Sequence, residues 1–288
     1  MANPRLISKR VKSIKNIGKI TKALEMVSAS RVQKAQDKAV SAKPYADMIH
    51  ELVGSLWGER ASVEIPLLRQ PIEIRSDLII LVSTNRGLAG SLNTNLFRSL
   101  SQFLEKRNTK HSFIAVGKKG RTFAMQTGEL VADFSGNNAL GSKVTDIVKI
   151  AMEGFVTGAY DEVFIVYSNF LTVLTQEPTL KRILPISAEE LFVEGETEDV
   201  KRAANFSYDP DPVTVLQELL PYNIEIQVAE SLYEAEASEH SARMIAMKNA
   251  SDNARELTEG LSLEYNKARQ SMITTEISDI TTAHESLK

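Results

Sequence analysis

The residues best placed to do chemistry in this 288-residue sequence form a glycine-rich stretch, STNRGLAGSLN, at positions 83–93. It follows a short apolar run and precedes a helical pattern, where backbone N–H groups at a helix start could bind a phosphate. The stretch matches neither the P-loop nor the dinucleotide-binding pattern, so a tight structural turn is the better interpretation. GKKGR (117–121) raises the same question more weakly.

Other catalytic or metal-binding patterns are not found. The four histidines (His50, His111, His240 and His284) have no partner at metal-ligand spacing, and the sequence has no cysteine. No Ser-His-Asp arrangement or pair of catalytic carboxylates can be identified. We therefore expect a non-catalytic chain with no metal and no cofactor.

Composition and charge limit the class of protein. The sequence is 43% hydrophobic and 25% charged, as in soluble globular proteins, and no apolar run is long enough to span a bilayer. The net charge of -3 hides a basic N-terminus, because residues 1–43 hold eleven basic residues against two acidic ones. We expect no cleaved transit peptide, since the helical pattern continues past residue 40.

An amphipathic helix is predicted from the N-terminus to about residue 57, with a break near Pro44. Its apolar positions recur every three or four residues, and a basic row runs along a different face. The apolar stripe comprises Ile7, Val11, Ile14, Ile17, Ile20, Leu24 and Val27, continued by Val32, Ala35, Ala39 and Ala42. The basic row comprises Arg5, Lys9, Lys12, Lys15, Lys19 and Lys22.

A second long helix is predicted for residues 209–288. Asp209 and Asp211 can cap its start, and Pro210 and Pro212 suit a first turn. Its coiled-coil seam is predicted to include Met247, Ala250, Ala254, Leu257 and Leu261. Helices of this length span roughly 75 to 90 Å, far more than the ~30 Å of a small domain. The simplest arrangement pairs the two chain ends as an antiparallel coiled coil.

The middle of the chain has the pattern of an α/β domain, predicted for residues 75–186. Apolar runs at 77–83, 112–117, 129–134 and 162–167 alternate with helical segments at 93–107, 118–127 and 142–158. This alternation predicts a mostly parallel sheet, and residues 169–186 predict one or two further strands in an edge hairpin. The acidic segment 187–208 is expected to be a linker. The predicted fold class is α/β plus coiled coil.

The basic helix could contact a membrane, a nucleic acid or another protein. Its apolar face lacks the aromatic residues that interfacial helices usually carry. Its lysine row could bind phosphates, but no recognised nucleic-acid-binding fold accompanies it and the whole chain is acidic. Branched aliphatic residues fit a coiled-coil seam, so we favour protein contact over a merely solvated lysine face.

Three segments of the sequence resemble the gamma-subunit family of F-type ATP synthases. They are KITKALEMVSASRVQKA (19–35), STNRGLAGSLN (83–93) and residues 239–280, and they occur in the family's order and spacing. The resemblance implies an antiparallel coiled coil of the two chain ends with a central Rossmann-like α/β domain. It also implies a central rotary shaft rather than an enzyme, which couples proton-driven rotation to ATP synthesis in other subunits.

The implied partners are the alpha and beta subunits of the catalytic ring, the epsilon subunit and the ring of c subunits, with no nucleic acid. The implied location is peripheral, on the cytoplasmic face of a bacterial plasma membrane. Two other classes stay open: a nucleic-acid-binding coiled-coil protein, which would show salt-sensitive retention on DNA or RNA, and a phosphate-handling α/β enzyme, which would show turnover by the isolated chain.

The family's functional positions can be carried over residue by residue. Contacts with beta subunits are implied for Lys19, Thr21, Lys22, Met26, Val27, Arg243, Asn266, Arg269, Gln270, Thr274 and Glu276. An ordinary coiled-coil or solvated face remains the alternative for each. In the glycine-rich stretch, Arg86, Gly87 and Gly90 match the family's turn, where a structural role is favoured over a nucleotide site.

Overall fold

The computed structural model describes residues 4–56, 65–136, 141–186 and 208–286. The chain divides into two compact units: unit 1 consists of Met1–Ala29 with Arg243–Lys288, and unit 2 of Ser30–Ala242. Each of the two predicted helical ends contributes to both units. Apart from Tyr208, the expected linker at 187–208 lies outside the described residues.

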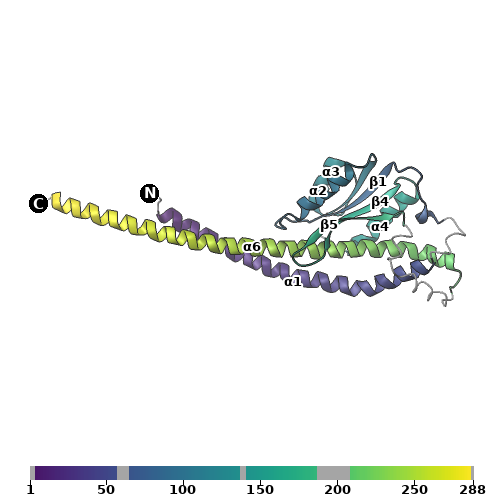
Figure 1. Cartoon of the computed structure of the whole chain (residues 1–288), viewed down its shortest axis with the longest axis horizontal. Coiled ribbons are helices and arrows are strands. Elements are labelled where there is room, and N and C mark those ends of the chain that lie inside the picture. The colour runs from purple at the N-terminus through teal and green to yellow at the C-terminus, as the bar shows by residue number, and fades with distance from the viewer. Residues whose placement is uncertain (1–3, 57–64, 137–140, 187–207, 287–288) are drawn as a thin grey trace. The chain divides into compact units, whose positions relative to one another are not determined.

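Two long helices carry the chain ends. Helix α1 spans Pro4–Leu56 and helix α6 spans Pro212–Ser286 (Figure 1). The start of α6 is capped as predicted, because Oδ1 of Asp211 accepts hydrogen bonds from the N–H groups of Val213 and Thr214, each at 3.0 Å.

The predicted break near Pro44 is wrong, because α1 continues through this proline. A proline inside a helix removes one backbone hydrogen bond and usually favours a kink or an end. Here the residues that follow compensate, since Ile49, Val53 and Leu56 are buried in the core of unit 2. Packing of these side chains keeps the last turns helical.

Unit 2 contains a five-stranded sheet in the order β3-β2-β1-β4-β5. All neighbouring strands are parallel except β5, which runs antiparallel to β4. The predicted mostly parallel sheet with an edge hairpin is confirmed, and the hairpin adds one strand. The strands are β1 (Ser76–Val82), β2 (Lys110–Val116), β3 (Glu129–Asp133), β4 (Glu162–Phe170) and β5 (Gln176–Leu184).

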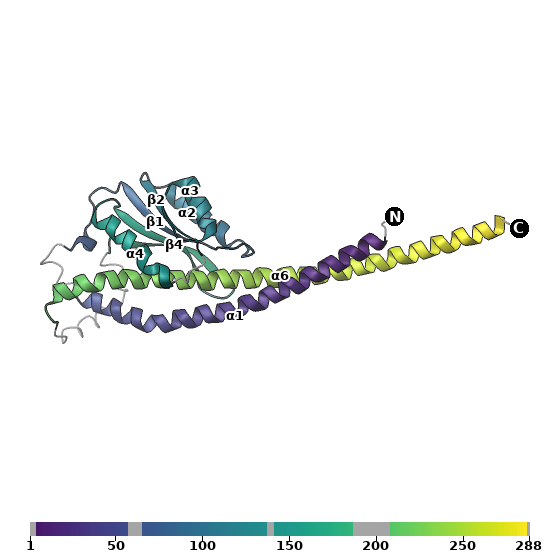
Figure 2. The same cartoon turned by 180° about the vertical axis from the view of Figure 1, so that it is seen from behind.

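Helices cover both faces of this sheet (Figures 1 and 2). Helices α2 (Leu92–Leu104) and α3 (Lys118–Thr127) pack on one face, against Ile79 and Leu81 of β1. Helix α4 (Gly141–Val156) packs on the other face together with the parts of α1 and α6 that belong to unit 2. Because both faces are covered, the central strands are apolar throughout, as their sequences indicate. A short 3-10 helix, η2 (Pro66–Leu68), precedes β1.

In unit 2, α6 contributes a regular ridge to the core. Five fully buried side chains recur at every fourth residue and belong to the same cluster as the sheet: Leu216, Leu220, Ile224, Val228 and Leu232. A row with this spacing forms the ridge that helices commonly pack into a neighbouring surface. The first part of the long C-terminal helix is therefore a core element of the α/β domain.

A buried ionic cluster closes the amino end of the sheet. Asp77 of β1 and Glu162 of β4 are buried, and both accept hydrogen bonds from the guanidinium of Arg107; the bond from Nε of Arg107 to Oδ2 of Asp77 is 3.0 Å long. That guanidinium also lies over the rings of Phe103 and Phe164, about 5 Å from each centroid. Removing one partner would leave a buried charge uncompensated.

Asp161 ties the segment before β1 to the segment before β4. Its Oδ2 accepts hydrogen bonds from the N–H groups of Arg75 at 2.9 Å and Ser76 at 3.1 Å. Burial raises the pKa of Asp161, but these hydrogen bonds and nearby Arg69 outweigh it, and the net pKa is lowered. The ionised carboxylate therefore stabilises the fold at neutral pH, and that contribution disappears as the pH falls through the folded-state pKa.

We expect Asp161→Asn to lower the free energy of unfolding at pH 7 by about 1–3 kcal/mol, the usual range for hydrogen bonds to a charged group. The difference from the unsubstituted chain should shrink as the pH falls below about 4, where the unfolded carboxyl becomes protonated before the folded one. Thermal unfolding followed by circular dichroism between pH 3 and 7 measures this. The control is Asp146→Asn, on the exposed face of α4. A difference that stays constant across this pH range would contradict the assignment.

Candidate partner-binding surface

Small side chains form the contact between the two helices of unit 1 at its closely packed points. An added Cβ at Gly18 of α1 would lie 3.3 Å from Cβ of Ala254 on α6, so the two backbones approach closely there. Thr21 and Ser28 of α1 and Ala254 and Met247 of α6 are buried. The hydroxyl of Thr21 donates to the carbonyls of Ile17 and Gly18 at 3.1 Å, so its burial leaves no donor unpaired.

Part of the predicted apolar stripe of α1 lies outside this seam. Ile17, Ile20 and Val27 are 51%, 60% and 51% exposed, whereas the next residue after each one is half-buried or buried. The physical reason is size, because a close helix approach needs glycine or small polar side chains in the contact. The prediction was correct for Ile7 in unit 1 and for Val32 in unit 2, which are buried.

Four of the five positions predicted for the seam of α6 are at least half-buried. Met247 and Ala254 are buried, and Ala250 and Leu261 are half-buried, but Leu257 is 57% exposed. At 100° per residue, Leu257 lies about 80° around the helix from Met247, at the margin of the stripe. The following residue, Thr258, is half-buried instead, and its hydroxyl donates to the carbonyl of Ala254 at 2.7 Å.

Next to the exposed aliphatic residues, α1 carries the predicted basic row. Lys9, Lys12, Lys15, Lys19 and Lys22 are all exposed. Nζ of Lys22 lies 2.9 Å from Oε1 of Glu25. The same stretch of α1 therefore offers three faces: a buried seam of small residues, an exposed aliphatic row formed by Ile17, Ile20 and Val27, and an exposed basic row.

The last part of α6 is exposed on every side. Each residue from Arg269 to His284 is exposed, and within unit 1 the helix continues past the first residues of α1 (Figure 2). Four large apolar side chains lie on this segment: Met272, Ile273, Ile277 and Ile280. Isolated helices of this length are marginal in water, and most helical stability in proteins comes from tertiary packing. The described part of the chain offers this segment no such packing.

Most residues implied to contact beta subunits lie on these exposed faces. The exposed members are Lys19, Lys22, Met26, Val27, Asn266, Arg269, Gln270, Thr274 and Glu276. Asn266, Arg269 and Gln270 share one face of α6, as the i, i+3, i+4 spacing predicts. Arg243 is half-buried. Thr21 is only 9% exposed, which leaves little of its surface for a partner.

The glycine-rich turn after β1 is held by its own side chains. The hydroxyl of buried Thr84 donates to the carbonyl of Arg86 at 2.8 Å, and Nδ2 of Asn93 donates to that hydroxyl at 2.7 Å. Gly87 lies in this turn, and Gly90 has a positive φ of 57°, which favours glycine.

At the start of α3, two backbone N–H groups that could bind a phosphate already have side-chain partners. Lys118 donates to Oδ1 of Asn85 at 3.1 Å, and Gly120 donates to Oγ of Ser83 at 2.6 Å. This bonding favours the structural interpretation of the turn over a phosphate site.

No three His, Cys, Asp or Glu side chains within 4–56, 65–136, 141–186 and 208–286 come together as a metal-binding group. No helix in the same ranges contains a segment long and apolar enough to cross a bilayer. His111 lies beside the ionic cluster, with Nδ1 3.4 Å from Oδ2 of Asp77.

The exposed aliphatic and basic faces of this helix pair indicate a surface for contact with other protein. The family model described as ATP synthase matches residues 3–287. The chain is 42% identical over 291 residues to the ATP synthase gamma chain of Roseiflexus castenholzii, with 97% of each chain covered. It is 40% identical to that of Herpetosiphon aurantiacus, again with 97% of each covered. The chain belongs to the ATP synthase gamma chain family.

A solved structure shares the fold. A chain of the Euglena gracilis mitochondrial ATP synthase, in a structure of OSCP, F1 and c-ring in rotational state 3, superposes with a TM-score of 0.65. The identity is 18%, and the match covers 99% of this chain and 94% of that chain. The predicted combination of a coiled coil with a Rossmann-like domain is thereby confirmed.

The close approach at Gly18 gives a testable prediction for unit 1. Gly18→Leu should lower the free energy of unfolding by about 1–3 kcal/mol, because overpacking forces the helices apart. Gly260→Leu on α6 is the matched control, since an added Cβ there meets nothing within 4 Å. It should be neutral or slightly stabilising, because leucine is the better helix former. Chemical unfolding of the two variants measures this, and equal effects would contradict the proposed contact.

Proposed function

We propose that the chain is the central rotary shaft of an F-type ATP synthase and couples rotation of a c ring to nucleotide-site changes in an alpha/beta ring. Family membership supports this function. The structural observation that carries it is the segment Arg269–His284 of α6, which is exposed on every side yet bears four large apolar residues. A ring of other subunits around this helix would supply the packing that the described chain lacks.

The partners follow from the same assignment. Alpha and beta subunits surround unit 1. The epsilon subunit and the c ring bind the part of the chain outside unit 1. The protein is peripheral and lies on the cytoplasmic face of a bacterial plasma membrane. The chain itself forms and breaks no bonds: ATP is made or hydrolysed in the ring, and the self-bonded turn after β1 agrees with a non-catalytic role.

The mechanism depends on the differing faces of α1. The aliphatic row and the basic row point in different directions. At any moment, therefore, the repeated copies of one ring subunit contact different side chains of α1. Moving a site from 1:99 to 99:1 between two states takes about 5.5 kcal/mol of differential interaction. Contacts between shaft and ring must therefore differ between orientations by an amount of that order.

The proposed contact residues combine the family positions with the structure. The exposed or half-buried family positions are Lys19, Lys22, Met26, Val27, Arg243, Asn266, Arg269, Gln270, Thr274 and Glu276. Ile17 and Ile20 join this set, because the structure leaves them exposed beside Val27. Seam residues such as Ala254 act only by holding the two helices together.

Reconstitution tests the proposed function. Adding the full chain to purified alpha and beta subunits should produce one stable assembly on size-exclusion chromatography and a strongly raised ATPase rate. The isolated chain should show no turnover of ATP. Failure to assemble, or turnover by the chain alone, would overturn the proposal.

A second test asks whether the aliphatic row contacts the ring. Replacing Ile17, Ile20 and Val27 together by serine should weaken assembly with alpha and beta subunits at least tenfold, because each buried aliphatic side chain contributes about 1.5–3 kcal/mol when fully enclosed. Ile72→Ser, at a fully exposed residue before β1, should leave assembly unchanged. Titration monitored by fluorescence anisotropy measures both. An unchanged affinity of the triple variant would show that this row faces solvent in the complex.

A further inference from the structure

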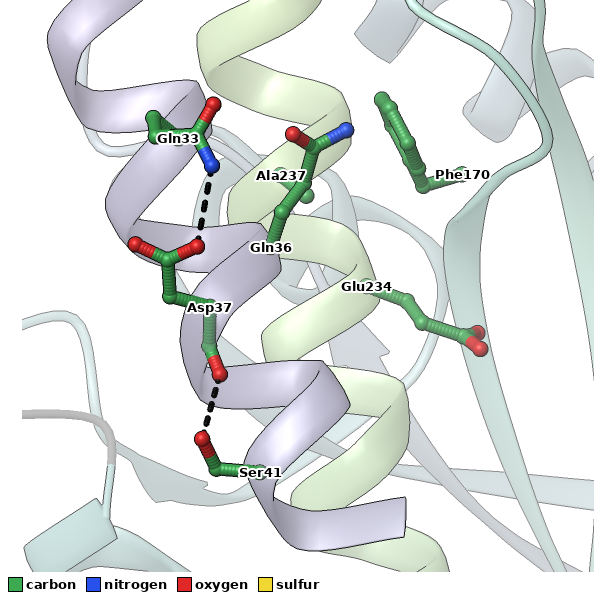
Figure 3. Close-up of a pocket in the computed structure, with 7 residues that line it drawn as sticks. All are labelled: Gln33, Gln36, Asp37, Ser41, Phe170, Glu234 and Ala237. Atoms are coloured by element: carbon green, nitrogen blue, oxygen red, sulfur yellow. Dashed lines mark hydrogen bonds between the residues drawn. The ribbon is translucent and has the colours of Figure 1, made fainter.

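Unit 2 contains a groove of about 600 Å³ that neither the seam nor the proposed ring contacts use (Figure 3). Helix α1 forms one wall, α6 forms the floor, and the end of β4 forms the other wall. Its volume is within the range of small-molecule sites. The lining residues are Gln33, Gln36, Asp37, Ser41, Phe170, Glu234 and Ala237.

The wall formed by α1 is polar, and one of its side chains is free to bind a ligand. Gln33 donates to Oδ1 of Asp37 at 2.9 Å, and Ser41 donates to the backbone carbonyl of Asp37 at 2.7 Å, so these residues form an ordered rim. Gln36 is half-buried and extends toward Phe170, and its amide forms no hydrogen bond with any described residue. An amide in this position can form a hydrogen bond with a ligand, either as the donor or as the acceptor.

The opposite wall combines an aromatic ring with a carboxylate. Phe170 is half-buried at the end of β4, and Glu234 projects from α6 on the same side of the groove (Figure 3). Burial raises the pKa of the Tyr167 hydroxyl, and the carboxylates of Glu234 and Glu230 raise it further. This wall therefore has a negative potential beside an aromatic face.

The lining chemistry selects one class of ligand. Both charged lining residues, Asp37 and Glu234, are acidic, which disfavours anions such as phosphates and nucleotides. A metal ion is disfavoured because the described residues contain no group of three metal-ligating side chains. A positively charged group over an aromatic ring gains cation–π attraction, and with a carboxylate it forms a charge-assisted hydrogen bond.

We infer that this groove binds a small organic cation with a planar head, an amidinium or guanidinium, on an aromatic or short aliphatic body. The head pairs with the carboxylate of Glu234, and the body packs on Phe170 beside Ala237. This inference concerns unit 2 alone and does not rest on the proposed shaft function.

Benzamidinium and benzamide provide the test, because they have the same shape and differ in charge. Titration of the full chain, followed by ligand-observed NMR, should give saturable binding of benzamidinium at least tenfold tighter than that of benzamide. Equal binding of the two compounds, or no saturable binding of benzamidinium, would overturn the inference.

Variants locate the site. Glu234→Gln should weaken benzamidinium binding at least fivefold and leave benzamide binding unchanged, since glutamine keeps the size of the side chain and removes its charge. Phe170→Leu should weaken both compounds. Glu256→Gln, at an exposed position of α6 away from the groove, is the matched control and should change neither. Unchanged binding by Glu234→Gln would exclude this groove. If Phe170→Leu fails to fold, the comparison of the two compounds on the Glu234→Gln variant decides.

Discussion

Two paired helices can each bury only one stripe of side chains, and the properties of unit 1 depend on that constraint. The close approach at Gly18 and Ala254 admits only small residues into the contact. Larger aliphatic side chains of α1 are consequently left in water, as are those at the end of α6. An exposed apolar surface of this kind marks a contact site for other protein. The packing of unit 1 thus provides the contact surface that the proposed shaft function requires.

The same two helices are packed differently in unit 2. There α1 contributes Ile49, Val53 and Leu56 to a core shared with the sheet, and α6 contributes its four-residue ridge. Large side chains suit this part because a sheet and α4 complete the enclosure, whereas in unit 1 each helix has only one neighbour. Side-chain size along one continuous helix thus reflects how many elements surround each part.

Much of the fold could be predicted from the sequence because its signals are local. Continuous apolar runs indicated strands covered on both faces, and Asp211 before Pro212 indicated the start of α6. The break expected at Pro44 was wrong because packing of the following turns outweighs one missing hydrogen bond. Such a balance depends on tertiary neighbours, which a local pattern does not contain.

The candidate surface was predicted less completely, for a different reason. Lysines of the basic row are exposed, since charge strongly favours water. Ile17 and Ile20 were assigned to the seam because hydrophobicity indicates burial without indicating whether the chain itself or a partner provides it. Gly18 and Thr21 have the same spacing one residue later, and only their small size could have signalled the actual contact.

The ridge from Leu216 to Leu232 has a mechanical consequence. Neither α6 nor the last turns of α1 can turn about their own axes within unit 2 without withdrawing large side chains from a core that also includes β1, β4 and α4. Close-packed interiors resist such deformation. A torque applied to either helix is therefore borne by the whole layered domain. Unit 2 thus holds both helices rigidly.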